Sequence, residues 1–184
     1  MRSVFVVLAL STLGCGSRAS IRAEVDIAAP PEVVWRVVSD VSRYGEWNPF
    51  ITRVDGTLAV DAEVLLHVTL RGGRAQRAQM QRIVALVPDR CLVWQTQVGT
   101  RHMLRARRSQ LVMPQADGST RYRTTDVFTG GLVPLVMRMY RKDLQAGFDA
   151  LTRGLKQRAE ALAGAMPAAA VDLRWPPGCP SVAD

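Results

Sequence analysis

Polar and apolar residues alternate with a period of two early in the chain and change to helical spacing near its end. The alternation over residues 21–27 predicts a strand with one buried face. Pro30-Pro31-Glu32 then predicts the start of a helix, because proline is tolerated in a first turn and a carboxylate is favoured near the positive end of the helix dipole. A second short helical segment is expected over residues 41–46.

Strand-like runs separated by glycine, proline and aspartate turns occupy the middle of the chain. They cover residues 64–70, 78–87, 91–98, 105–113 and 122–128. Apolar residues then recur at helical spacing from residue 137 to residue 163, which predicts one long amphipathic helix. Its apolar stripe is wide enough to need a whole sheet as its partner.

This order of elements predicts an α+β fold. A curved antiparallel β-sheet is expected to wrap around a long C-terminal α-helix, with two short helices after the first strand. Because one helix cannot completely fill a strongly curved sheet, we also expect an internal cavity. The domain is expected to span residues 21–163.

The two ends of the chain differ from this domain. Residues 1–20 carry Arg2 and a short apolar run, which is typical of a signal peptide or lipoprotein leader and too short to span a membrane. Cys15 follows Leu13-Gly14 as in a lipoprotein cleavage site, and the alternatives are lipidation of Cys15, an ordinary exported leader, or an uncleaved stub. The expected location is accordingly exported, periplasmic or membrane-anchored, and cytoplasmic if the leader does not function. Residues 164–184 predict a flexible tail.

Composition disfavours several classes of function. The 24 lysines and arginines outnumber 16 acidic residues, which gives a formal net charge of +8. The arginines are scattered, however, and no aromatic residues interleave with their densest cluster, so nucleic-acid binding is disfavoured. The cysteines and histidines show no metal-ligand spacing, and we expect neither a metal nor a cofactor. Cys91 is expected to be a buried thiol, with a Cys91–Cys179 disulfide after export as the alternative.

Several short segments of the chain resemble the SRPBCC or START-like superfamily, and specifically its polyketide cyclase/dehydrase-like branch. They are AAPPEVVW at residues 28–35, YGEWNPF at 44–50, DGSTR at 117–121, FTGGLVP at 128–134, and residues 147–160. The resemblance implies a helix-grip fold with a deep, mostly apolar cavity for lipids, polyketides or other hydrophobic molecules. The chain departs from the branch pattern at residues 98–108, where Arg107-Arg108-Ser109 replaces an expected histidine–aromatic pair.

The best polar candidates come from the hairpin around Asp117-Gly118. If these two residues form the turn, alternate residues of both strands share one face: Arg107, Ser109, Leu111 and Met113 with Tyr122, Thr124, Asp126 and Phe128. The apolar members indicate that this face is the inner one. Arg107 and Asp126 are then diagonal neighbours. Because buried charges are costly unless paired, this pair is either structural or the polar end of a ligand site.

Other side chains are expected to line the cavity from neighbouring elements. Trp94 lies in phase with apolar residues of its strand, and Met137 and Tyr140 belong to the long helix. The predicted ligand-binding residues are Trp94, Arg107, Leu111, Tyr122, Thr124, Asp126, Phe128, Met137 and Tyr140.

Two hypotheses of function follow from these observations. In the first, the protein binds or transports a hydrophobic small molecule, lipid or polyketide-like, in its cavity, with no nucleic-acid partner and with peripheral membrane association through a lipid anchor. In the alternative, it is a cyclase or dehydratase in which Asp126, Tyr122 or His102 moves protons on a polyketide-like or aromatic substrate. The non-catalytic hypothesis is favoured because no acid–base pair is recognisable in the sequence.

Overall fold

The computed structural model describes residues 17–70 and 75–164, together with residue 179. The elements follow in the order β1 (Arg18–Ile27), α1 (Pro31–Ser39), η1 (Val41–Arg43), α2 (Tyr44–Trp47), β2 (Ile51–Asp55), β3 (Glu63–Leu70), β4 (Ala75–Val87), β5 (Cys91–Val98), β6 (Leu104–Pro114), β7 (Thr120–Thr129) and α3 (Val133–Ala163). No helix within this described part is both long and apolar enough to cross a membrane.

Both predicted terminal segments fall largely outside the described residues, and so does the candidate lipidation site Cys15. At the N-terminal boundary, β1 begins at Arg18, so residues 18–20, which the sequence pattern placed in the leader, are part of the sheet. Of the predicted tail, residues 164–184, only Gly164 and Cys179 are described.

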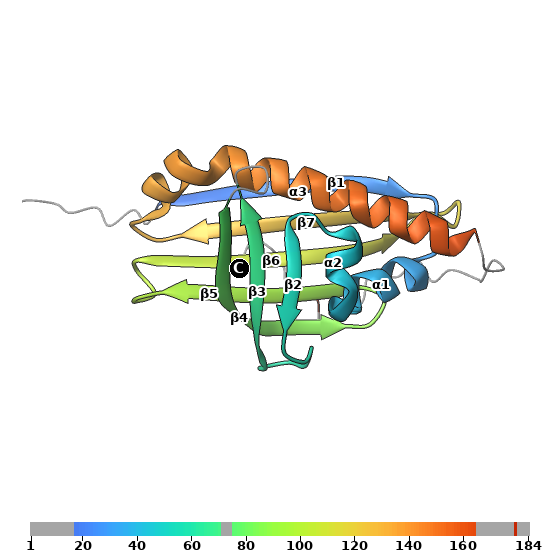
Figure 1. The fold of residues 1–184 in the computed structure, drawn as a ribbon, viewed down its shortest axis with the longest axis horizontal. Coiled ribbons are helices and arrows are strands. Elements are labelled where there is room, and N and C mark those ends of the chain that lie inside the picture. Colours follow the sequence, from blue (N-terminus) through green and yellow to red (C-terminus); the bar gives the residue numbers. More distant parts are fainter. Residues whose placement is uncertain (1–16, 71–74, 165–178, 180–184) are drawn as a thin grey trace, which may run out of the picture.

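The seven strands form one antiparallel sheet in the order β1-β7-β6-β5-β4-β3-β2. Figure 1 shows β1, β7 and β6 running roughly along α3, while β2 and β3 cross in front of them at a steep angle. The sheet therefore curls around α3, with α1 and α2 at one end. This arrangement confirms the predicted helix-grip fold.

The short strand β2 was not predicted, and its pairing explains why. A bulge shifts the register against β3 between Ile51 and Arg53. As a result, the buried residues of β2 are Ile51 and Val54, three positions apart instead of two. A bulge breaks the alternation on which strand prediction depends.

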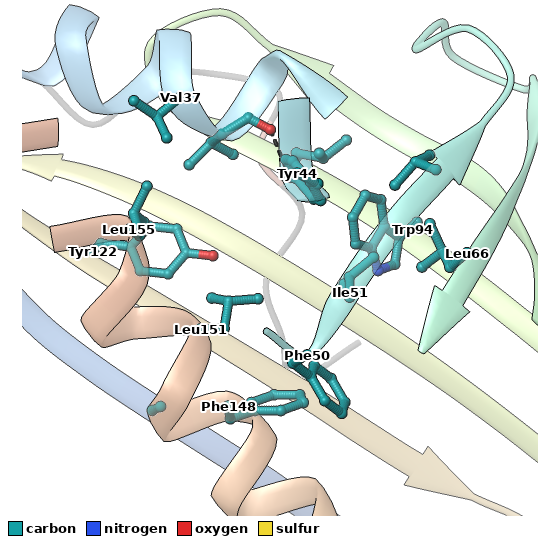
Figure 2. Close-up of a cluster of buried hydrophobic side chains, with 14 of the residues drawn as sticks. Val37, Tyr44, Phe50, Ile51, Leu66, Trp94, Tyr122, Phe148, Leu151 and Leu155 are labelled. Carbon is teal, nitrogen blue, oxygen red and sulfur yellow. Dashed lines mark hydrogen bonds between the residues drawn. The ribbon is translucent and has the colours of Figure 1, made fainter. Parts of the chain in front are cut away.

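The first helix follows the predicted pattern closely. Pro30 is its N-cap and Pro31 its first residue, and four valines of its inward face are buried. The hydroxyl of Tyr44, fully buried at the start of α2, donates a 2.7 Å hydrogen bond to the carbonyl oxygen of Val38 at the end of α1. The bond appears in Figure 2 and joins the two short helices at one end of the sheet.

The two halves of α3 differ in how closely they pack against the sheet. In its C-terminal half, Phe148, Leu151 and Leu155 are at most 1% exposed. In its N-terminal half, Val133 of the first turn is 2% exposed, but the other side chains that contact the core, among them Val136 and Tyr140, are only partly buried. The core is therefore filled at the α1 end and incompletely filled near the start of α3.

The β6–β7 hairpin corrects the predicted register. Its loop is longer than the expected two-residue turn, with the N–H of Gln115 bonded to the carbonyl oxygen of Ser119 at 2.9 Å. Consequently Asp126 lies opposite Arg108, and not opposite Ser109. The β7 residues keep their predicted inward face, but every β6 residue changes sides, because a one-residue slip inverts a strand.

A disulfide joins Cys91 at the start of β5 to Cys179, with their Cα atoms 6.1 Å apart. Cys91 is fully buried on the sheet face opposite α3, across from Leu111 of β6. The expectation of a free buried thiol at Cys91 is therefore wrong, and the alternative of a disulfide is the one observed. The crosslink closes a sequence separation of 88 residues.

We predict that Cys179→Ser lowers the free energy of unfolding by roughly 2–4 kcal/mol, because loss of a long-range crosslink increases the entropy of the unfolded chain. Chemical denaturation under oxidising conditions measures this change. Wild-type protein with the disulfide reduced is the matched control and should unfold at the same denaturant concentration as the variant. Equal stability of the oxidised wild type and the variant would contradict the prediction.

Candidate functional site

A cavity of about 790 Å³ lies between the inner face of the sheet and the N-terminal half of α3. Its walls are formed mainly by apolar residues of the sheet, of α3 and of the segment before β2. They include Phe50, Leu66, Val68, Leu70, Trp94, Leu104, Ala106, Phe128, Val136 and Leu144. The volume is in the range of about 300–1,000 Å³ that is typical of small-molecule sites.

The packed core closes one end of this cavity. The rings of Phe50 and Phe148 lie 5.6 Å apart between their centroids and meet between the sheet and α3 (Figure 2). Trp94, Ile51 and Leu66, also labelled in Figure 2, belong to the same cluster of buried apolar side chains. These large side chains separate the cavity from the filled half of the core.

The other end of the cavity reaches the molecular surface. Its lining there includes Met80 of β4 and Val98 of β5, which are 52% and 49% exposed. Polar residues of β4, among them Arg77 and Gln79, stand at the same rim. A ligand therefore has a route from solvent into the apolar interior.

The chain segments beside this rim are held together by backbone hydrogen bonds. The carbonyl oxygens of His102 and Met103, between β5 and β6, accept bonds of 2.8 and 2.9 Å from the N–H groups of Gly131 and Leu132. Gly130 makes this approach possible, since a Cβ there would lie 2.5 Å from the Met103 oxygen and its φ is +118°. The glycines before α3 thus fix the start of that helix against the β5–β6 loop.

A charged side chain, Arg108 of β6, stands at the boundary between the cavity and the packed core. It is only 5% exposed, and its guanidinium carbon lies 4.1 Å from the centroid of the Phe148 ring. The Phe50 and Trp94 rings follow at 5.5 and 6.0 Å. The Arg108 Nε–H donates a 3.1 Å hydrogen bond to Thr124, whereas Nη2 is buried without a partner among the described residues.

Asp126 of β7 lies opposite Arg108 in the sheet and also lines the cavity. Within the described part of the chain, its Oδ1 atom is buried without a hydrogen-bond partner, and no ion-pair contact joins it to Arg108. Burial raises the pKa of Asp126 to about 6, although the positive charge of Arg108 acts in the opposite direction. Burial also lowers the pKa of Arg108. The arginine nevertheless stays charged, as arginines in proteins do.

A polar row continues from this pair into the core. The Tyr122 hydroxyl donates a 2.8 Å hydrogen bond to Gln110 Oε1, and burial raises the Tyr122 pKa. Gln110 is 1% exposed, and its Nε2 is buried without a partner among the described residues. The row lies on one continuous inner face of β6 and β7, and Arg108 and Asp126 are its members that line the cavity.

The predicted site residues divide into four groups, of which Arg107 and Leu111 form the last. Trp94, Asp126, Phe128 and Tyr140 line the cavity, while Tyr122 and Thr124 face inward but are fully buried and do not line it. Met137 is partly buried against the core and is not among the lining residues.

Arg107 and Leu111 were placed on the wrong face of the sheet. Both belong to the β6 face directed away from α3, because the hairpin loop shifts the register by one residue. Arg108 takes the position that the sequence analysis gave to Arg107. Only the length of the β6–β7 loop could have identified Arg108 in advance, since the two arginines are adjacent and chemically identical.

The histidine considered for catalysis lies outside the cavity wall. His102 is exposed in the turn after β5, where its Nε2 accepts a 3.0 Å hydrogen bond from Arg101. Within residues 17–70, 75–164 and 179, no cluster of three or more histidine, cysteine or acidic residues could hold a metal ion. Among the charged residues of the cavity wall, Arg108 and Asp126 are the two with a buried side-chain atom that lacks a hydrogen-bond partner within the described part of the chain.

A curled sheet that grips one long helix around an accessible apolar cavity defines the class of START-like ligand-binding folds. Residues 18–160 match the family described as polyketide cyclase / dehydrase and lipid transport. The match covers most of the chain, which therefore belongs to this family. No curated protein is similar enough in sequence to count as a match.

Solved structures share the fold at low sequence identity. A Thermus thermophilus protein aligns with a TM-score of 0.63 at 16% identity, over 79% of this chain and 99% of its own. A START superfamily protein from Mycobacterium smegmatis aligns with a TM-score of 0.58 at 22% identity, over 78% and 98%. The Zhui aromatase/cyclase from a Streptomyces species gives 0.58 at 19% identity, over 80% and 94%.

A larger protein also contains this fold. The di-domain ARO/CYC StfQ from the steffimycin biosynthetic pathway aligns with a TM-score of 0.64 at 14% identity over 80% of this chain. The alignment covers 52% of StfQ, so this chain spans about half of its length. At such identities the likeness shows the fold alone.

We predict that the unfolding free energy of Asp126→Asn, compared with that of the wild type, increases as the pH rises from about 4 to about 7. The folded protein holds the Asp126 proton up to about pH 6, whereas the ordinary value is 3.8, so wild-type stability falls as pH rises through this window. Asparagine does not ionise, so the variant avoids this decrease in unfolding free energy, which amounts to about 2–3 kcal/mol.

Denaturant unfolding of both proteins at several pH values measures this difference. The surface carboxylates titrate alike in the two proteins, so their contributions cancel in the comparison. A difference in unfolding free energy that stays constant from pH 4 to pH 7 would show that Asp126 titrates normally.

Proposed function

We propose that this protein binds a hydrophobic small molecule, lipid or polyketide-like, inside the cavity between the sheet and α3. The observation that carries the proposal is the cavity of about 790 Å³, apolar over most of its wall and open at one rim. Filling such a space with an apolar ligand buries surface that would otherwise contact water. Membership of a family described by both polyketide chemistry and lipid transport supports the same ligand class.

The energetic setting also favours binding. An apolar ligand in this cavity would make dispersion contacts with the side chains of both walls. The walls are strands of one hydrogen-bonded sheet and the turns of a helix, so the backbone around the cavity needs little ordering when a ligand binds. Val68, Leu70 and Leu144 belong to two different elements of this wall, so a ligand would contact the sheet and the helix together.

We predict that Thr96→Trp abolishes binding of a neutral apolar dye such as Nile red while changing stability little. Thr96 is partly exposed and lines the cavity from β5, so an indole can occupy the space a ligand would take. Dye fluorescence with increasing protein concentration measures binding, and thermal unfolding measures stability.

Thr57→Trp is the matched control, because Thr57 is exposed between β2 and β3 and does not line the cavity. This variant should bind the dye as the wild type does. Undiminished binding by a folded Thr96→Trp protein would overturn the proposed location of the ligand.

A second candidate function is catalysis of the cyclase or dehydratase type on a polyketide-like or aromatic substrate. The observation that favours it is the Asp126 carboxylate on the cavity wall, whose pKa of about 6 suits a general base near neutral pH. Arg108 stands opposite and would stabilise negative charge that develops on a substrate oxygen.

If the protein is an enzyme, Asp126→Asn should reduce turnover of a poly-β-ketone substrate by about a hundredfold or more, since general acid–base catalysis supplies about 10²–10⁴-fold. Binding of Nile red should be unchanged, because asparagine has nearly the same size as aspartate. Product analysis by mass spectrometry measures turnover. Undiminished turnover in the variant would exclude Asp126 as the catalytic base.

A further inference from the structure

We infer that the cavity selects an amphipathic ligand bearing a carboxylic acid, held at Arg108 and Asp126 with its apolar part toward the rim. This inference rests on the proposed binding function and names the chemical class of its ligand. It begins from a charged side chain that the fold buries without completing its hydrogen bonds. Arg108 is 5% exposed, and its Nη2 atom has no partner among the described residues.

The contacts that Arg108 makes do not compensate fully for its burial. Removing an ion from water remains costly even after the protein relaxes. A cation near an aromatic face recovers only part of that cost, and the closest ring, that of Phe148, lies at 4.1 Å. The hydroxyl of Thr124 supplies one neutral hydrogen bond. A guanidinium in this setting should attract an anion strongly.

Asp126 does not serve as that anion at contact distance. It lies directly across the sheet from Arg108, yet within the described part of the chain the two side chains form no ion pair, and Asp126 Oδ1 is also buried without a partner. Two groups that can carry opposite charges therefore share one wall of the cavity with an unsatisfied atom on each. A ligand group at this wall could bond to both.

A carboxylic acid is the group that satisfies both atoms. One of its oxygens can accept a hydrogen bond from the Arg108 guanidinium, as carboxylates do in charge-assisted pairs. Its other oxygen can share a proton with Asp126, because two carboxyl groups in contact hold one proton between them. The bound site then contains one guanidinium, one carboxylate and one neutral acid, so its net charge is zero. A methyl ester lacks both the charge and the shared proton.

The cavity positions the rest of such a ligand. Arg108 stands where the cavity meets the packed rings of Phe50 and Phe148, so the acid group lies deep in the protein. The lining between this point and the exposed Met80 and Val98 includes Leu66 and Phe128. A chain or fused ring attached to the acid would therefore lie along apolar walls.

Binding should be accompanied by proton uptake at Asp126. The charged or titratable groups that share the cavity with Asp126 are Arg108 of β6, Tyr140 of α3, Arg77 and Arg82 of β4, and Glu63 of β3. Glu63 is already paired with Arg82 at 3.2 Å. Because a ligand carboxylate beside Asp126 disfavours a second negative charge, the site should take up about one proton near pH 7.

The test compares acids with their esters. Dodecanoic acid and naphthalene-2-carboxylic acid are each paired with their methyl esters, and displacement of Nile red measures all four affinities. We expect at least one acid to bind the wild type at least about tenfold more tightly than its ester, as one charge-assisted hydrogen bond implies. Arg108→Met should remove this preference, so that each acid binds the variant no more tightly than its ester does.

Two further variants test whether the acid preference arises at Arg108 and whether Asp126 takes up the proton. Arg77→Met removes a cation from the cavity rim and should keep the acid preference, because Arg77 is exposed to solvent whereas Arg108 is buried at the packed end of the cavity. Asp126→Asn should abolish the proton uptake that accompanies acid binding, because asparagine does not titrate; calorimetry in buffers of different ionisation enthalpy measures this uptake. If Arg108→Met does not fold, Arg108→Lys and the wild-type acid-to-ester ratios still test the inference.

The outcomes distinguish this inference from the proposed function. Equal affinity of acids and esters for the wild type would overturn the carboxylate assignment and leave apolar binding intact. An acid preference that survives Arg108→Met, or disappears in Arg77→Met, would overturn the role of Arg108. Failure of the dye and all four compounds to bind would overturn the proposed function itself.

Discussion

The burial of one arginine between the sheet and the helix constrains how this protein is built. The Arg108 guanidinium lies over the Phe148 ring of α3 and near Phe50 and Trp94, so three separate segments of the chain must converge on it. An apolar side chain would fill this position at lower cost in desolvation. Beside it, Thr124 accepts a hydrogen bond from Arg108, and Tyr122 donates one to Gln110. These polar groups at the deep end of the cavity therefore all lie on its β6–β7 side.

The cavity follows from the geometry of one helix inside a curled sheet. The C-terminal half of α3 fills the sheet with Phe148, Leu151 and Leu155, and the short helices α1 and α2 complete that end. No further element covers the other end among the described residues, where partly buried side chains of α3 face the sheet across the cavity. The same curvature that makes a closed core at one end therefore leaves a binding space at the other.

Sequence patterns were sufficient to predict the fold because its elements, apart from the short strand β2, are long and strongly periodic. The β7 residues Tyr122, Asp126 and Phe128 face inward as expected, since alternation alone determines their side of the sheet. The partner strand could not be placed so simply. Its face depends on how many residues form the hairpin loop, and a loop from Gln115 to Ser119 instead of a two-residue turn exchanges Arg107 for Arg108. A local turn signal identified the hairpin but not its register.

The disulfide on the opposite face of the sheet can offset part of the stability that the cavity costs. A cavity of about 790 Å³ between the sheet and α3 takes the place of side-chain packing that a continuous core would supply. The Cys91–Cys179 disulfide closes a segment that includes β6, β7 and α3, the elements that carry Arg108, Asp126 and Tyr140. Because the crosslink stabilises chiefly by restricting the unfolded chain, it adds no side chain to the inner face. Cys91 and Trp94 lie on opposite faces of β5, so the disulfide is attached to a strand of the cavity wall without occupying the cavity itself.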